Sequence, residues 1–139
     1  MKYFLIAIFM IFFCASCDIN TEKPNYDYSI DQSLVCFCPP DGTVRVFVKS
    51  DSISDVISLS DNVHLEKSRW SNYRTIKGLF NEITTHDTAR FFVNVEMDQY
   101  RLYPTLVSIN PKPVTYDSVM IIISDAGYSY ITSNYKILR

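Results

Sequence analysis

Glycine is scarce in this chain: Gly42, Gly78 and Gly127 are the only three among 139 residues. A phosphate-binding P-loop and a dinucleotide-binding turn each need several glycines close together, because the backbone must approach phosphate groups closely. The three glycines lie too far apart in the sequence for either motif. The sequence therefore excludes both kinds of nucleotide site.

Histidine is scarcer still, with His64 and His86 alone. A zinc site needs three or four ligands at characteristic spacings, and neither histidine has such a spacing to the other or to a cysteine. The Gly-x-Ser-x-Gly elbow that carries the nucleophile of many hydrolases is also missing. We therefore expect no metal, no cofactor and no enzymatic activity.

An excess of positive charge is missing as well. Lysine and arginine number 13 and aspartate and glutamate 15, which gives a formal net charge of -2. Proteins whose main partner is a nucleic acid present a basic surface to its phosphates. We therefore expect no nucleic-acid partner.

The longest apolar run is short and lies at residues 3–13 (YFLIAIFMIFF), directly after Lys2. A helix that spans a bilayer needs about 20 apolar residues, so this run is too short to span comfortably. A positive residue followed by a short apolar stretch is instead typical of a signal peptide. An uncleaved signal anchor is the alternative interpretation.

The leader ends in the sequence CASC at residues 14–17. Small residues directly before Cys17 resemble the bacterial lipobox, although Cys14 stands where a leucine is usual. The resemblance implies cleavage before Cys17, lipidation of Cys17 and a lipid anchor to a bacterial membrane in the cell envelope, with the leaflet left open. The predicted organisation is a signal peptide at 1–16, a lipidated tether at 17–25 and a single globular domain at 26–139.

The first half of the domain predicts three strands and then one helix. Apolar residues alternate with polar ones in 26–38, 44–48 and 53–59, which is the period of half-buried strands. The sequence Ser-Asp-Ser at 50–52 is a plausible hairpin connection, and 61–72 reads as irregular. The helix is predicted from an apolar stripe that follows a possible cap at Thr75: Ile76, Leu79, Phe80 and Ile83.

The second half predicts strands again. They are expected at 91–97, 105–109, 119–123 and from 128 onwards. The continuous apolar run at 119–123 predicts a well-buried strand. Strands joined by short turns pair antiparallel, and an amphipathic helix must bury its stripe against the sheet. The predicted fold class is α+β: an antiparallel sheet of about six strands with one amphipathic helix packed on one face, in the order three strands, helix, three strands.

Several short motifs occur in a characteristic order. They are Cys36-Phe37-Cys38, the helix start Thr75-Ile76-x-x-Leu79-Phe80, and Tyr103-Pro104-Thr105. Together they resemble a family of small bacterial envelope lipoproteins of unknown function, over roughly Tyr26 to Ile123. Leu102 stands where that family usually has a glycine, and Asn110 where it often has an aspartate. The resemblance implies fold and location, and it transfers no catalytic residue.

Cys36 and Cys38 form the one notable pair of reactive side chains. Exported proteins meet oxidising conditions, so a disulfide is plausible. Two residues apart in a regular strand, however, the Cα atoms are about 6.6 Å apart, at the edge of the range for a disulfide. A structural disulfide, two packed thiols, or a redox pair or metal ligands all remain open.

Aromatic residues follow the predicted helix in connecting segments. Tyr100, Tyr103 and Pro104 could form a contact surface, because tyrosine brings a large area with a polar tip. The alternative is that these aromatics edge the core of a β-rich domain. The sequence does not decide between the two.

The favoured hypothesis is a non-enzymatic, membrane-anchored envelope lipoprotein that binds an unknown envelope protein or assists assembly. The first alternative is a thiol-redox protein that uses Cys36 and Cys38. The second is an inhibitor-like domain that acts on an envelope or secreted enzyme, argued from fold analogy alone.

Overall fold

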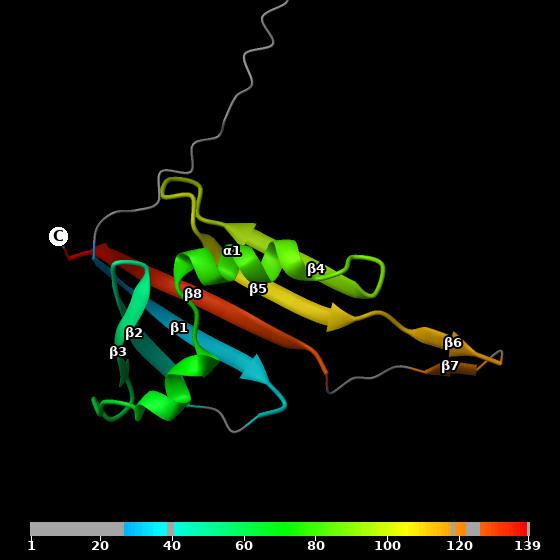
Figure 1. Cartoon of the computed structure of the whole chain (residues 1–139), viewed down its shortest axis with the longest axis horizontal. Coiled ribbons are helices and arrows are strands. Elements are labelled where there is room, and N and C mark those ends of the chain that lie inside the picture. Colours follow the sequence, from blue (N-terminus) through cyan, green and yellow to red (C-terminus); the bar gives the residue numbers. More distant parts are fainter. Residues whose placement is uncertain (1–26, 39–40, 118, 122–125, 139) are drawn as a thin grey trace, which may run out of the picture.

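A computed structural model describes residues 27–38, 41–117, 119–121 and 126–138 (Figure 1). The predicted leader, Cys17 and the predicted tether lie outside the described residues. The elements, in chain order, are β1 (Tyr28–Cys36), β2 (Thr43–Lys49), β3 (Ser52–Ser58), the 3-10 helix η1 (Lys67–Asn72), α1 (Ile76–Thr85), β4 (Phe91–Met97), β5 (Pro104–Pro111), β6 (Val114–Tyr116), β7 (Val119–Ile121) and β8 (Tyr128–Ile137).

Six strands form one antiparallel sheet in the order β3-β2-β1-β8-β5-β4. The last strand of the chain, β8, therefore lies in the middle, between β1 and β5. The predicted antiparallel sheet of about six strands is confirmed. In the described part of the chain, no helix is long and apolar enough to cross a membrane.

The alternation in β2 produces one buried and one open face. Val44, Val46 and Val48 are buried, whereas Thr43 and Lys49 are exposed. The connection to β3 is tight because Lys49 pairs with Ser52 and the two residues between them have positive φ. This backbone suits the twist of a two-residue hairpin, and it confirms the hairpin predicted at 50–52.

Helix α1 begins at its predicted cap. The Oγ1 atom of Thr75 accepts a hydrogen bond from the backbone nitrogen of Gly78 at 3.0 Å. The hydroxyl of Tyr28 in β1 accepts another from the backbone nitrogen of Ile76 at 2.9 Å. Burial raises the pKa of Tyr28 to about 12, so this hydroxyl stays protonated. These two acceptors satisfy amides at the start of the helix that have no partner within it.

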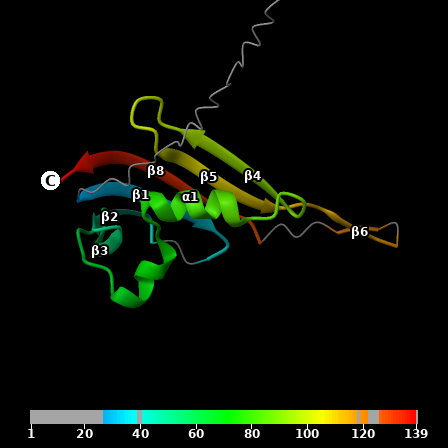
Figure 2. The same ribbon diagram turned by 45° about the horizontal axis from the view of Figure 1, so that its top comes forward.

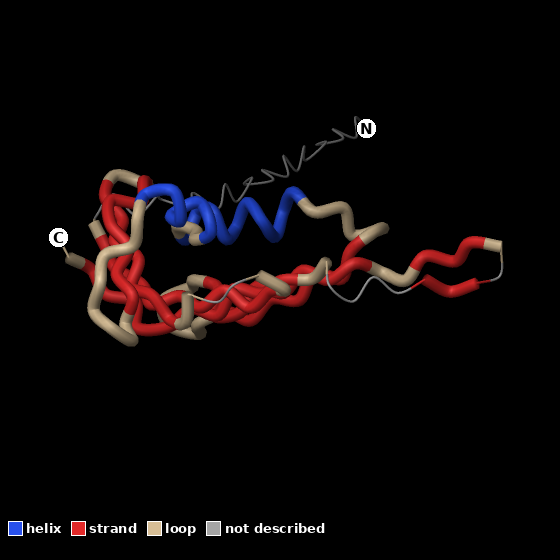
Figure 3. The backbone as a smooth tube through the Cα atoms, turned by 90° about the horizontal axis from the view of Figure 1, so that it is seen from below, coloured by secondary structure: helices blue, strands red, loops and turns tan. Residues whose placement is uncertain are grey.

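Two buried clusters lie on the same side of the sheet as α1. In one, Leu79 of the helix packs with Val107, Ile109 and Tyr130. The other gathers around the β1–β2 half: Tyr28, Ile30, Val44, Val46, Val48, Val56, Leu65, Tyr73 and Tyr103. Figures 2 and 3 show α1 over this side, with no helix on the opposite side in the described part of the chain.

The segment predicted as a buried strand at 119–123 lies elsewhere. Residues 119–121 form β7, which pairs with β6 in a separate two-stranded sheet. Its described side chains are exposed, and residues 122 and 123 lie outside the described residues. The prediction of a buried strand was wrong for residues 119–121, because this run pairs with β6 outside the six-stranded sheet and its side chains are exposed.

Candidate functional site

The β6–β7 hairpin extends beyond the end of the six-stranded sheet (Figure 1). Tyr116 pairs with Val119, and Asp117 in the tight turn has a φ of 46°. The hairpin's exposed apolar side chains are Val114 (57%), Val119 (62%), Met120 (64%) and Ile121 (48%). None of the four belongs to either buried cluster. The hairpin therefore offers apolar surface that the fold itself does not use.

Cys36 and Cys38 lie at disulfide-bonding distance, with Cα atoms 5.1 Å apart. The distance is shorter than in a regular strand because β1 ends at Cys36 and the chain bends at Phe37 and Cys38. Phe37 and Cys38 are exposed, and a shallow depression of about 240 Å³ beside Cys36 includes Phe37 and Tyr128 in its wall. This placement favours the disulfide among the three alternatives.

The three residues of the predicted contact surface, Tyr100, Tyr103 and Pro104, have different environments in the structure. Tyr100 is 92% exposed, but Tyr103 is only 5% exposed and Pro104 is buried. The ring of Tyr103 packs against that of Tyr135, with centroids 5.3 Å apart. Tyr103 and Pro104 are therefore core residues. Tyr103 belongs to the buried cluster around β1 and β2, and Pro104 is the first residue of β5. Tyr100 alone remains on the surface.

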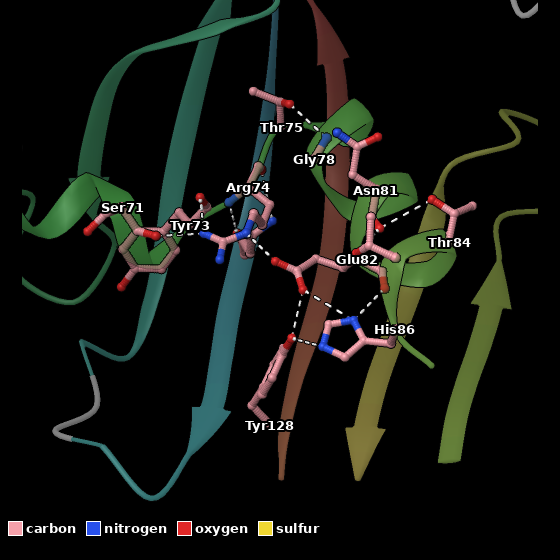
Figure 4. A network of polar contacts seen from close by, with 12 residues as sticks. Ser71, Tyr73, Arg74, Thr75, Gly78, Asn81, Glu82, Thr84, His86 and Tyr128 are labelled. Atoms are coloured by element: carbon pink, nitrogen blue, oxygen red, sulfur yellow. Dashed lines mark hydrogen bonds and ion pairs between the residues drawn. The ribbon is translucent and has the colours of Figure 1, made fainter. Parts of the chain in front are cut away.

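A network of polar side chains joins α1 to the sheet (Figure 4). Arg74 Nε donates to Glu82 Oε1 at 2.7 Å, and the Tyr128 hydroxyl of β8 donates to Glu82 Oε2 at 2.6 Å. His86 Nε2 lies 3.1 Å from the same hydroxyl, and His86 Nδ1 lies 2.7 Å from the backbone oxygen of Glu82. Gln32 of β1 binds the backbone of Arg74 through both ends of its amide.

The protonation states in this network follow from its contacts. Burial tends to raise the pKa of Glu82, but the hydrogen bonds from Tyr128 and Arg74 and the charge of Arg74 outweigh it. The pKa of Glu82 therefore lies below its ordinary value. Burial, together with the Glu82 carboxylate, raises the pKa of Tyr128 well above its ordinary value. Glu82 is an anion and Tyr128 a neutral phenol at neutral pH.

This arrangement holds the helix against the sheet. Both carboxylate oxygens of Glu82 accept hydrogen bonds, and the Arg74 guanidinium also lies over the Tyr130 ring, 5.4 Å from its centroid. An ionised acceptor with both oxygens engaged has little capacity left to take a proton from a substrate. Among the described residues, no three Cys, His, Asp or Glu side chains gather in a way that could hold a metal ion.

A family model described as a family of unknown function, DUF6174, matches residues 20–128. The chain belongs to DUF6174. No curated protein and no solved structure matches the chain. The unknown-function part of the resemblance found in the sequence is thus confirmed. The matched span contains the cysteine pair, the β6–β7 hairpin and the whole Arg74–Glu82–Tyr128 network.

Two features of the structure could not be predicted from the sequence: the place of the 119–121 strand and the polar network around Glu82. The apolar run at 119–121 gave a signal for a strand, but nothing in the pattern placed that strand outside the main sheet. Arg74, Glu82 and Tyr128 are scattered over 55 positions of the chain, and no spacing rule joins them. The one local signal was Glu82 and His86 at helical spacing (i, i+4) on α1.

Proposed function

We propose that this chain is a membrane-anchored envelope lipoprotein without enzymatic activity, and that its domain binds another protein through the β6–β7 hairpin. The single observation that carries the binding role is the hairpin's exposed apolar surface, made of Val114, Val119, Met120 and Ile121. The sequence supports the anchor: an apolar leader is followed by a lipobox-like CASC that ends at Cys17.

The hairpin is better suited to being covered by a protein partner than to remaining exposed to water. A two-stranded hairpin is marginally stable in water unless something covers one of its faces. Among the described residues, β6 and β7 pair with each other and with no further strand, so each has an outer edge that no described strand covers. Such edges can accept an additional strand, and apolar side chains beside them add contact area. Neither strand carries a lysine or a proline that would block such pairing.

The test is photocrosslinking in the cell that makes the protein. A photoreactive phenylalanine analogue replaces Met120 in the hairpin, or Asn94 in β4 as the matched exposed control. We expect a discrete protein adduct at position 120 that is weak or missing at 94. Equal patterns at both positions, or no protein adduct at 120, would contradict the binding role. A captured hydrolase that loses activity at a 1:1 ratio would identify the inhibitor-like form of the same proposal.

The lipid anchor is tested separately. Mass spectrometry of the mature N-terminal peptide should show acyl chains on Cys17, and a Cys17→Ser protein should lose membrane association. A mature protein with an unmodified Cys17 that remains in the aqueous fraction would refute the anchor.

A thiol-exchange role is the second candidate, and the exposed position of Cys38 beside Cys36 favours it. A disulfide that closes so short a loop stabilises the fold by only about 1.6 kcal/mol in the chain-entropy model. Thiolate attack on this bond by a substrate protein would give a mixed disulfide and release the other cysteine as a thiolate. A reduction potential below about −300 mV, as in structural disulfides, would argue against this role.

A further inference from the structure

The tether enters the domain at one defined end of the sheet. Asp27 is the first described residue, and its backbone oxygen accepts a hydrogen bond from the nitrogen of Leu138 at 2.7 Å. Tyr28 pairs with Ile137, so the start of β1 lies beside the end of β8. Figure 1 shows this end and the β6–β7 hairpin at opposite ends of the molecule. From Cys17 to Asp27 the chain can span at most about 35 Å.

The β4–β5 loop, residues 98–103, lies at this same end. Arg101 Nη1 donates to the backbone oxygen of Tyr135 in β8 at 2.5 Å. Within the loop, Asp98 Oδ1 accepts hydrogen bonds from the backbone nitrogens of Tyr100 at 2.9 Å and Arg101 at 2.6 Å. The loop is therefore fixed in shape by its own aspartate and fixed in place by Arg101.

The fixed loop presents apolar side chains to the outside. Tyr100 is 92% and Leu102 71% exposed. Leu102 also has a φ of 53°, a backbone conformation that is unfavourable for a residue with a branched side chain. The positive φ at Leu102 accompanies the hydrogen bonds that close the loop, from Leu102 N to Asp98 O and from Asp98 N to Tyr103 O. The closed loop leaves the leucine side chain in water.

Cations lie beside these apolar side chains. Arg101 and Lys136 line a shallow depression of about 470 Å³, together with Tyr100, Tyr135 and Ile137. Ile137 is exposed, whereas the Asp98 carboxylate is engaged by the loop backbone. Exposed tyrosine and aliphatic side chains flanked by arginine and lysine match the interface of a bilayer, where rings sit at headgroup level and cations meet phosphate.

We propose that Tyr100, Arg101, Leu102, Lys136 and Ile137 form a tether-end surface that lies against the anionic phospholipid bilayer holding the lipid anchor. The inference rests on the anchor proposed above. A short tether keeps the surface within about 35 Å of the bilayer, so that even weak contacts are populated at high effective concentration. Docking at this end directs the β6–β7 hairpin away from the membrane, toward a partner protein.

The test uses the lipidated protein reconstituted in phospholipid vesicles. A photoreactive phenylalanine analogue is placed at position 100 in one sample and at position 120 in another. We expect phospholipid adducts at position 100, at a yield several-fold above that at position 120. The yield at 100 should rise with the fraction of anionic lipid in otherwise zwitterionic vesicles.

Charge variants give a second readout. Arg101→Gln and Lys136→Gln should each lower the docking equilibrium about fivefold in anionic vesicles, since each removes a cation near the headgroups. Arg90→Gln is the matched control, because Arg90 is exposed and lies directly before β4, at the end of the sheet that carries the hairpin. It should leave the adduct yield at position 100 unchanged. Unaltered fluorescence of Trp70 shows that the domain of each variant is folded. Because Arg101 also holds the loop in place, Lys136→Gln carries the test of charge by itself.

The outcomes separate the two proposals. A protein that floats with the vesicles and still gives no phospholipid adduct at position 100 overturns the tether-end surface and leaves the anchor intact. An equal loss with Arg90→Gln overturns it as well. A protein with an unmodified Cys17 that stays in the aqueous fraction overturns the anchor, and the tether-end surface is lost with it.

Discussion

Strand β5 and the β6–β7 hairpin follow one another in the chain and have opposite environments. Both contain valine and isoleucine, but Val107 and Ile109 of β5 are buried under Leu79, whereas Val119 and Ile121 of β7 are exposed. The difference lies in what covers each strand. β5 lies between β4 and β8 beneath the helix, whereas β6 is the one neighbour of β7 among the strands that the structure describes. An apolar sequence therefore predicts a strand, while tertiary contacts decide whether its side chains are buried or free to bind.

The largest effect on stability is expected when the side chain that covers β5 is truncated. Leu79→Ala should lower the free energy of unfolding by about 2–5 kcal/mol, because it leaves a cavity against Val107 and Ile109. Urea denaturation followed by Trp70 fluorescence measures the change. Phe80→Ala on the same helix is the comparison variant, and it should cost less, because Phe80 of the predicted apolar stripe is 38% exposed whereas Leu79 is fully buried. Equal losses for both variants would show that α1 does not pack through Leu79.

A second variant tests the polar attachment of the segment that precedes α1. Gln32 is fully buried, and its amide accepts from the backbone nitrogen of Arg74 at 2.8 Å and donates to its backbone oxygen at 3.2 Å. Gln32→Ala should lower the free energy of unfolding by about 1–3 kcal/mol, the cost of leaving buried polar groups without partners. Gln99→Ala, at an exposed position in the β4–β5 loop, is the control. A neutral effect at Gln32 would mean that water replaces its amide.

These two positions also show how far the sequence could predict the fold. The spacing of Leu79 within the apolar stripe and the cap at Thr75 placed the helix, because both signals are local. The alternation in β2 identified its buried valines for the same reason. The role of Gln32 could not be predicted from the sequence, because its partner Arg74 lies 42 residues away. A single glutamine in a strand also gives no sign that its side chain is buried. Non-local contacts of this kind are what single-sequence reasoning lacks.

The candidate sites follow the same division. The sequence shows that Cys36 and Cys38 lie two positions apart, but whether their geometry suits a disulfide depends on where β1 ends. Tyr103 and Tyr100 look alike in the sequence, and only the start of β5 at Pro104 makes one a core residue and the other a surface residue. The sequence predicted a strand at Val119 correctly but its burial wrongly, because β7 pairs with β6 outside the six-stranded sheet.

The ion pair between Arg74 and Glu82 makes a pH-dependent contribution to the free energy of unfolding. The pKa of Glu82 is lower in the folded protein than its ordinary value of 4.5. The stabilisation is therefore present above pH 4.5 and is lost as the pH falls through the lowered folded pKa. Glu82→Gln should cost on the order of 1 kcal/mol at pH 7 and less at pH 3, which urea denaturation at both values measures.

A matched carboxylate serves as the control for this titration. Asp31 binds Arg45 at 2.7 Å and Asn134 at 2.8 Å on the sheet face opposite α1, and these contacts outweigh its burial and lower its pKa too. The Glu82→Gln protein should therefore keep part of its acid sensitivity. An identical cost at pH 7 and pH 3 would contradict an ionised Glu82 in the network.

The smallest effect on stability is expected in the hairpin, whose apolar side chains are exposed where those of β5 are buried. Ile121→Ser should change the free energy of unfolding by no more than about 0.5 kcal/mol, because the side chain is exposed and belongs to neither buried cluster. Ile109→Ser in β5 is the matched variant, and it should destabilise the domain by several-fold more. If the hairpin binds a protein, Ile121→Ser should abolish the adduct captured at position 120 while the domain stays folded. A stability loss as large as that of Ile109→Ser would show instead that the hairpin's apolar side chains support the fold. The exposed side chains of β7 would then have the same structural role as the buried ones of β5.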